Sequence, residues 1–264
     1  MFRALQTASL GMSSQQLKVD NISNNLANVN TTGFKRSDIA FQDLFYQTLS
    51  SSSQGSSVNN PANDAPELQI GHGSRPVADT RNFMQGSLEE TGNSMDMAID
   101  GDGFFMIEKT DGSIAYTRDG DFNLNSTGEI VNSSGLPLAD YIEVPEDAVG
   151  ISISQDGVVT AQIDGEASPM DLGQIEMAKF INPAGLRAEG GNLFAETEAS
   201  GPPMIGIPGM DGFGGIQQGY LEQSNVDIVN EMVSLITAQR AYETNSKMVQ
   251  TAEDMMAMTN QIKR

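Results

Sequence analysis

The sequence contains no cysteine and no tryptophan, and its single histidine is His72. Without cysteine the chain can form no disulfide and can offer no thiolate ligand to a metal. One histidine leaves little material for general-base catalysis, and the G-x-S-x-G pattern of many serine hydrolases does not occur. We therefore expect a protein that is not an enzyme and that holds no cofactor or metal.

Basic residues are also scarce, because 14 Lys and Arg stand against 35 Asp and Glu, a net charge of −21. Nucleic acids and anionic membranes are bound through clusters of Lys and Arg, so this balance speaks against both as partners. No segment approaches the roughly 20 apolar residues that cross a bilayer. The start, "MFRALQTASLGMSSQQLK", lacks the apolar core of a signal peptide. We expect no membrane insertion, and any export by a route without a cleaved signal peptide.

The charge is distributed unevenly along the chain. Residues 1–46 contain four basic and three acidic side chains, and residues 221–264 contain four basic and six acidic ones. Residues 47–220 contain six basic side chains against 26 acidic ones. Two nearly neutral ends therefore flank a strongly acidic centre, which favours ends that contact protein and a centre that faces water.

The beginning of the chain has apolar residues spaced alternately three and four apart, as on one stripe of a helix. The stripe consists of Leu5, Ala8, Met12, Gln15, Val19, Ile22, Leu26 and Val29, of which only Gln15 is polar. Gly33 is suited to end this helix, with Lys35 and Arg36 near its last carbonyl groups. We assign residues 1–46 to an N-terminal helical segment, which either folds onto its own domain or serves assembly.

A low-complexity stretch follows this segment. Residues 50–66 read "SSSSQGSSVNNPANDAP" and contain almost no apolar side chain. Such a composition is typical of a disordered linker or a long loop. We assign residues 47–94 to a Ser-, Asn- and Pro-rich extended loop or hairpin.

The centre of the chain has the period of β-strands. Apolar runs at 104–107 and 114–117 flank "KTDGS", which indicates a hairpin. "FNLNSTGEIV" (122–131) and "GISISQDGVVTAQIDGEAS" (150–168) indicate two more. We assign residues 95–220 to an antiparallel β domain.

The end of the chain returns to a helical pattern, and we assign residues 221–264 to a C-terminal helix. Ser224 or Asn225 could cap it. The expected fold class is α+β, with the N- and C-terminal helices pairing as a coiled-coil-like domain beside the antiparallel β domain.

One acidic motif resembles the start of a calcium loop. In "DGDFNLNSTGEI" (119–130), Asp119, Asp121 and Asn123 stand at positions one, three and five. Leu124 replaces the glycine of the sharp turn, and Ile130 replaces the bidentate glutamate. A β-turn is therefore the better interpretation.

Three long motifs together resemble the bacterial flagellar rod and hook family. "ISNNLANVNTTGFKR" (22–36) is similar to its N-terminal signature, and "QGYLEQSNVDIVNEMVSLITAQRAYETNSKMVQTAEDMM" (218–256) to its C-terminal signature. "DMAIDGDGFFMIEKTDGSIAYTRDGDFNLNSTGEIV" (96–131) resembles the shared β domain. Within the family, the chain length and "LQIGHGSRPVA" (68–78) most resemble the distal rod subunits.

The resemblance implies a structural function. Family members are exported by the flagellar type III export apparatus and stack helically into a tubular drive shaft across the periplasm, which transmits torque to the hook and encloses the export channel. The implied partners are further copies of the same chain, proximal rod subunits, hook subunits and the surrounding P and L rings. Two alternatives are a proximal rod protein of the same family and an acidic secreted binding or hydrolytic module.

The resemblance and the helical patterns together suggest which residues serve function. We expect subunit assembly to use Leu5, Met12, Val19, Ile22, Asn25, Leu26, Asn28, Val29, Val229, Met232, Val233, Ile236, Gln239, Arg240 and Tyr242. The asparagines among 21–30 could form hydrogen bonds between subunits, line a wet channel, or belong to a solvated helix end. Phe41 and Phe45 match a spaced-aromatic export motif but are equally typical of core residues. Ser50, Pro61 and Pro66 mark a segment that we expect to be ordered in the assembly and to stiffen it.

Overall fold

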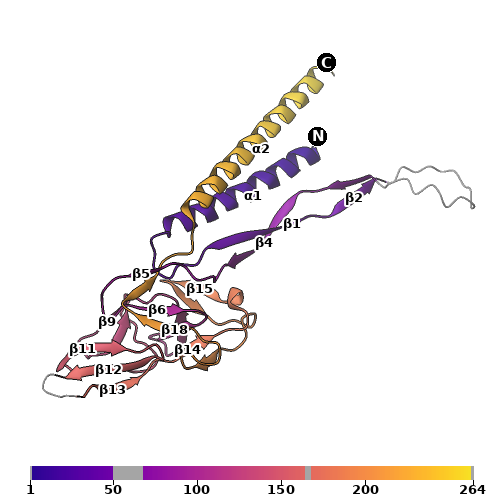
Figure 1. The fold of residues 1–264 in the computed structure, drawn as a ribbon. Coiled ribbons are helices and arrows are strands. Elements are labelled where there is room, and N and C mark those ends of the chain that lie inside the picture. The colour runs from indigo at the N-terminus through magenta and orange to yellow at the C-terminus, as the bar shows by residue number, and fades with distance from the viewer. Residues whose placement is uncertain (1, 50–67, 164–167, 263–264) are drawn as a thin grey trace, which may run out of the picture. The chain divides into compact units, whose positions relative to one another are not determined.

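The computed structural model describes residues 2–49, 68–163 and 168–262 and divides them into two compact units (Figure 1). The terminal unit contains residues 2–24, 38–49, 68–79 and 229–262, and the β unit contains residues 25–37, 80–163 and 168–228. The predicted class is confirmed, because two helices at the ends of the chain enclose a run of antiparallel strands. The expected stiffening segment with Ser50, Pro61 and Pro66 lies outside the described residues.

Two helices and four strands belong mostly to the terminal unit. They are α1 (Phe2–Ala27), β1 (Ser37–Asp43), β2 (Tyr46–Leu49), β3 (Leu68–Gly71), β4 (Ser74–Arg81) and α2 (Ile228–Ile262). The strands form two ribbons, in which β1 pairs with β4 and β2 pairs antiparallel with β3. The helices approach closely at Gly11, where a Cβ atom would lie only 3.0 Å from Asn245 Nδ2.

The expected extents of both terminal helices are wrong. Helix α1 ends at Ala27 because the next residues close tight turns, in which Thr31 N–H donates to Asn28 O at 3.1 Å. Gly33 therefore does not end the helix, and β1 begins within the expected helical segment. Helix α2 begins only at Ile228, directly after Asp227, so neither Ser224 nor Asn225 caps it.

The β unit contains fifteen strands and one short 3₁₀ helix. They are β5 (Leu88–Glu90), β6 (Met97–Asp100), β7 (Phe104–Glu108), β8 (Ile114–Thr117), β9 (Phe122–Leu124), β10 (Ile130–Asn132), β11 (Ala148–Ile153), β12 (Val158–Ile163), β13 (Met170–Gln174), β14 (Met177–Lys179), η1 (Pro183–Gly185), β15 (Arg187–Gly190), β16 (Leu193–Ala195), β17 (Met204–Gly206), β18 (Gly215–Gln218) and β19 (Tyr220–Glu222). The three predicted hairpins are confirmed as the antiparallel pairs β7–β8, β9–β10 and β11–β12.

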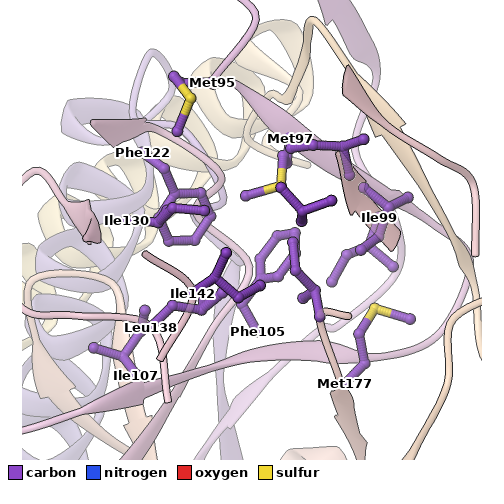
Figure 2. Close-up of a cluster of buried hydrophobic side chains, with 14 residues drawn as sticks. Met95, Met97, Ile99, Phe105, Ile107, Phe122, Ile130, Leu138, Ile142 and Met177 are labelled. Atoms are coloured by element: carbon purple, nitrogen blue, oxygen red, sulfur yellow. The ribbon is translucent and has the colours of Figure 1, made fainter. Parts of the chain in front are cut away.

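The core of the β unit lies on both faces of a six-stranded sheet ordered β15-β16-β8-β7-β14-β17. Strand β7 lies in its interior, and successive side chains of a strand point to opposite faces. Phe105 and Ile107 therefore enter one buried cluster with Phe122 (Figure 2). Phe104 and Met106 enter a second cluster on the other face. This two-sided burial explains the uninterrupted apolar run of β7.

Both edges of this sheet are protected against the addition of another strand. Strand β15 is exposed, has an irregular register, and carries the ion pair of Arg187 with Glu189 at 2.9 Å. Strand β17 has three residues and is flanked by Pro203 and Pro208. Charges, irregular register and prolines all discourage edge-to-edge pairing. The six-stranded sheet is therefore a poor template for polymerisation through its backbone.

Strands from late in the sequence complete the unit by pairing with earlier ones. β18 pairs antiparallel with β6, and β19 pairs antiparallel with β5. These pairs bring residues 215–222 beside residues 88–100. Among the described residues, no helix is long and apolar enough to cross a membrane.

Candidate functional site

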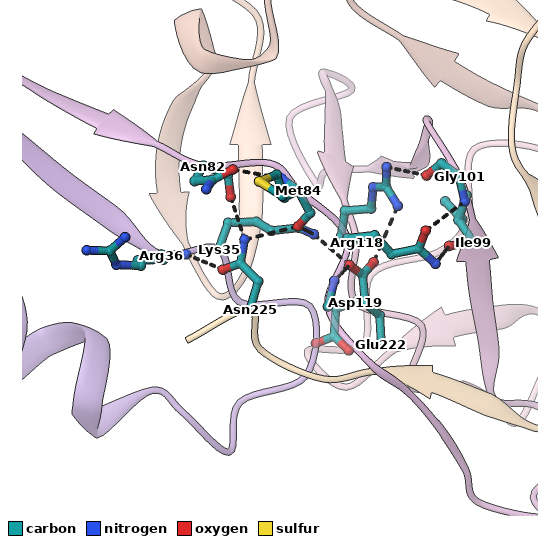
Figure 3. Close-up of polar contacts among 12 residues, drawn as sticks. Lys35, Arg36, Asn82, Met84, Ile99, Gly101, Arg118, Asp119, Glu222 and Asn225 are labelled. Atoms are coloured by element: carbon teal, nitrogen blue, oxygen red, sulfur yellow. Dashed lines mark hydrogen bonds and ion pairs between the residues drawn. The ribbon is translucent and has the colours of Figure 1, made fainter. Parts of the chain in front are cut away.

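Three charged side chains are buried together in the β unit (Figure 3). Lys35 Nζ donates to Glu222 Oε1 at 2.6 Å, and Arg118 Nη1 lies 3.3 Å from Glu222 Oε2. The exposed fractions of these side chains are 1% for Lys35, 3% for Arg118 and 0% for Glu222. Backbone carbonyl groups accept one further hydrogen bond from each cation, because Lys35 Nζ also bonds Met84 O at 2.9 Å and Arg118 Nη2 bonds Gly101 O at 2.7 Å. Arg118 Nε is buried without a hydrogen-bond partner.

Burial dominates the electrostatics of this cluster. It lowers the pKa of Lys35 and the pKa of Arg118, because a desolvated cation is disfavoured, and the carboxylate of Glu222 opposes both shifts. Gly86 N–H also donates to Glu222 Oε1, at 2.8 Å. Both carboxylate oxygens therefore already hold donors, which suits a structural tie between segments better than general-base chemistry.

Asn225 ties the same segments together through its side-chain amide (Figure 3). Its Oδ1 accepts from Arg36 N at 2.8 Å, and its Nδ2 donates to Asn82 O at 2.8 Å and Met84 O at 3.0 Å. Asn82 N–H in turn donates to Arg36 O at 2.8 Å. The amide thus joins three segments that are far apart in the sequence.

Within the β unit, the turn at Gly33 packs against residues that lie far along the chain. Gly33 has a φ of 66°, its N–H donates to Glu222 O at 2.7 Å, and a Cβ atom there would lie 2.6 Å from Asp119 N. Thr32 Oγ1 donates to Asp119 Oδ1 at 2.8 Å, and Asn192 Nδ2 donates to Asp119 Oδ2 at 3.1 Å. The first residue of the calcium-like motif is thus engaged in this packing. Within the described ranges, no group of three or more His, Cys, Asp or Glu could hold a metal.

Asn25 is one of the asparagines at the end of α1, and its side chain is buried. Its Nδ2 donates to Ser37 O at 2.8 Å, and its Oδ1 accepts from Ser37 N–H at 3.0 Å. The side-chain amide therefore satisfies both backbone groups of Ser37, the first residue of β1, as a neighbouring strand would do. The side chain of Asn25 therefore forms hydrogen bonds within its own chain.

Helix α2 presents its large apolar side chains to solvent. Val229, Met232, Val233 and Ile236 are each about half exposed or more, and Val229 reaches 70%. With about 100° between successive helical residues, these four side chains form one stripe, which we call the α2 stripe. The stripe lies roughly opposite the buried Ala238 on α2.

The remaining predicted assembly residues differ in exposure. Ile22 is buried, and Gln239, Arg240 and Tyr242 are exposed on α2. The half-buried members are Leu5, Met12, Val19, Leu26, Asn28 and Val29. The stripe of α1 is thus largely covered, whereas that of α2 is open.

The two predicted export residues lie in or beside the ribbons of the terminal unit. Phe41 belongs to β1 and is 37% exposed, whereas Phe45 lies between β1 and β2 and is 89% exposed. The alternative that both are core residues is therefore wrong for Phe45.

Sequence reasoning missed the cluster of Lys35, Arg118 and Glu222. It interpreted Lys35 as a helix-end charge, because helix geometry was the only partner visible in the sequence. No local pattern relates Lys35 to a glutamate far along the chain. The one signal in the sequence was composition, because 35 Asp and Glu offer each of the 14 Lys and Arg several acidic partners.

Comparison with known proteins identifies relatives along the whole chain. Residues 5–35 match the family described as flagella basal body rod protein, residues 98–161 the flagellar hook protein FlgE/F/G D1 domain, and residues 217–262 the flagellar basal body rod FlgEFG protein C-terminal family. The chain is 48% identical to the flagellar basal-body rod protein FlgG of Borreliella burgdorferi, with all of both chains covered. It is 45% identical to that of Caulobacter vibrioides, with 99% of each chain covered. It is 38% identical to that of Bacillus subtilis over the whole of both chains.

Proposed function

The chain belongs to the FlgE/F/G family of flagellar rod and hook proteins, and we propose that it forms the distal rod of the flagellar basal body as a helical homopolymer. As a member of this family it is a structural protein of the basal body. In the proposed assembly the terminal segments make the contacts between copies and surround an export channel, and the polymer transmits torque to the hook.

The observation that carries the proposed mode of assembly is the open α2 stripe. Four large apolar side chains, Val229, Met232, Val233 and Ile236, face solvent on the side of α2 away from its buried residues. Contiguous apolar surface of this kind marks protein–protein contact sites. Coiled-coil-like pairing of the terminal helices is part of the proposal, with the stripe of α2 covered by helices of neighbouring copies.

The β unit supports the same proposal because its sheet edges and its acidic residues both disfavour contacts between copies. Its six-stranded sheet has protected edges at β15 and β17, so strand addition there is disfavoured. The acidic residues of the chain are concentrated between residues 47 and 220. Like charges would repel neighbouring copies there, which favours contacts made by the nearly neutral ends.

The remaining expectations belong to the same proposal. The chain crosses the periplasm in the assembled rod, after export without a cleaved signal peptide, and Phe41 and Phe45 serve recognition by the export apparatus. The neighbours in the flagellum are proximal rod subunits on one side, hook subunits on the other, and the P and L rings around it. The segment with Ser50, Pro61 and Pro66 stiffens the rod.

A charge on the α2 stripe tests the proposal. Ile236→Asp should raise the critical concentration for polymerisation of the purified chain by at least about tenfold, because an unpaired carboxylate is costly to bury. Thr259→Asp adds the same charge at an exposed position of α2 that faces away from the stripe, and it is the matched control. Sedimentation and electron microscopy measure the polymer, and thermal unfolding checks that both variants are folded. Equal polymerisation of Ile236→Asp and the parent chain would contradict the role of the stripe.

A further inference from the structure

A groove in the terminal unit lies between α1, α2 and the turn that joins β3 to β4. Its volume is about 840 Å³. The residues that line it include Ala8, Gly11, Ile70, Met248, Ala252 and Met255. No Asp, Glu, Lys or Arg is found among the described residues that line it. Several of the lining residues are small, and the flexible thioethers of the two methionines can adapt to an inserted group.

Phe45 belongs to the same unit but does not line this groove. With 89% exposure it is the most exposed large apolar side chain among the described residues, and Tyr46 beside it is 56% exposed. Both lie where the ribbon of β1 with β4 meets the ribbon of β2 with β3. A two-stranded ribbon cannot bury its own faces and is stable only against another surface.

We propose that Phe45 of one copy inserts into the groove of the next copy. A groove of this size is within the range that accepts whole small ligands, so a phenyl ring fits. Neither the groove lining nor the residues 44–47 around Phe45 carry a formal charge. The contact therefore avoids the repulsion that two chains of net charge −21 otherwise have.

The arrangement of the two patches gives the contact a direction. The ring and the groove are different surfaces of one chain, so each copy gives a ring to one neighbour and takes a ring from another. Such a heterologous contact repeats without closing when its rotation does not form a ring. This inference rests on the proposed helical polymer and names one of its contacts.

The absence of cysteine allows a direct test by crosslinking in the full chain. Phe45→Cys and Thr251→Cys are prepared as single variants and as a double variant, because Thr251 is an exposed residue at the groove on α2. Glu253→Cys is the matched control, since it is exposed on the same turn of α2 but points away from the groove. Oxidation of a mixture of Phe45→Cys and Thr251→Cys should give a dimer, and the double variant should give a ladder of larger species. The mixture of Phe45→Cys with Glu253→Cys should give no disulfide-linked dimer.

Other crosslinking patterns overturn the inference. A dimer of Phe45→Cys with itself would show a symmetric contact, and an intramolecular disulfide in the double variant would place the side chain in its own groove. No crosslink in any mixture, while the parent chain polymerises normally, would remove this contact but leave the proposed function intact. A parent chain that never polymerises, alone or in crosslinked mixtures, would contradict the inference and the proposed function together.

Truncation of the ring provides a second readout. Phe45→Ala should raise the critical concentration for polymerisation roughly ten- to hundredfold, which is the range for losing one buried phenylalanine side chain. Val77→Ala removes an exposed apolar side chain from β4, in the ribbon of β1 with β4, and should leave the critical concentration within about twofold. Equal effects of the two variants would overturn the specific role of Phe45.

Discussion

Lys35 Nζ lies 2.6 Å from Glu222 Oε1, although 187 positions separate the two residues in the chain. Both side chains are fully buried, and Arg118 shares the same carboxylate. A buried carboxylate between two cations is therefore the electrostatic centre at which the beginning and the end of the β unit are joined.

We predict that Glu222→Gln destabilises the β unit by about 3–5 kcal/mol, because it leaves Lys35 and Arg118 as buried cations without a counter-charge. Denaturant unfolding of the full chain, followed by a probe of the β-sheet, measures the loss. Glu90→Gln, at an exposed position of neighbouring β5, is the control and should stay within about 0.5 kcal/mol of the parent. A loss below 1 kcal/mol for Glu222→Gln would mean that the cations are readily solvated.

We predict that Gly33→Ala costs more than the same change at another glycine of similar backbone conformation. Gly33 has a φ of 66° and Gly135 has a φ of 80°. At either position the left-handed backbone lowers the stability of the alanine variant by roughly 1 kcal/mol. Only at Gly33 would the new methyl group also collide with backbone, at 2.6 Å from Asp119 N, whereas nothing lies within 4 Å at Gly135. Parallel melts of the two variants check the difference, and equal costs would show that the turn can move away from the β unit.

We predict that Asn25→Ala destabilises the chain by about 1–3 kcal/mol. The change leaves the N–H and C=O groups of Ser37 without the two hydrogen bonds that Asn25 makes to them. Asn30→Ala, at an exposed position of the following turn, is the control. Chemical denaturation gives both values. If Asn25→Ala instead unfolds like the control but fails to polymerise, the amide acts between copies and not within one.

We predict that Asp140 makes the β unit less stable as the pH rises. Burial raises the pKa of Asp140 from 3.8 to about 6, the nearby charge of Glu176 adds to the shift, and the hydrogen bond from Glu176 N–H to Oδ2 opposes it. The protonated form is therefore favoured in the fold, so its full benefit is present below about pH 4 and is lost as the pH rises through 6.

Asp140→Asn should accordingly raise the free energy of unfolding at pH 7 by about 1 kcal/mol, a figure reduced from the full linkage value because Asp140 is partly exposed. Near pH 4 the variant and the parent should agree. Unfolding curves between pH 4 and 7 measure both limits. A constant difference across that range would assign the effect to packing and not to titration of Asp140.

Much of the local structure was accessible from the sequence. The run at 104–107 and the turn "KTDGS" predicted the β7–β8 hairpin, because turn chemistry and strand period act over a few residues. The helical spacing from Leu5 onward predicted α1 for the same reason. The end of α1 was missed because Val29 continues the helical spacing beyond Ala27, although residues 28–33 are poor helix formers and close tight turns that place Gly33 against Asp119 and Glu222.

The sequence by itself determined the fold class, the hairpins, the acidic centre and the family, because each depends on composition, on short-range periodicity or on motifs contiguous in the chain. Only the tertiary structure decided which charges meet and which surfaces remain open. The pairing of Lys35 with Glu222 depends on how β5 and β19 come together, and the exposure of Phe45 and Ile236 depends on which side of each element the rest of the unit covers. Burial and ion pairing are properties of residues distant in the chain, and no local pattern contains them.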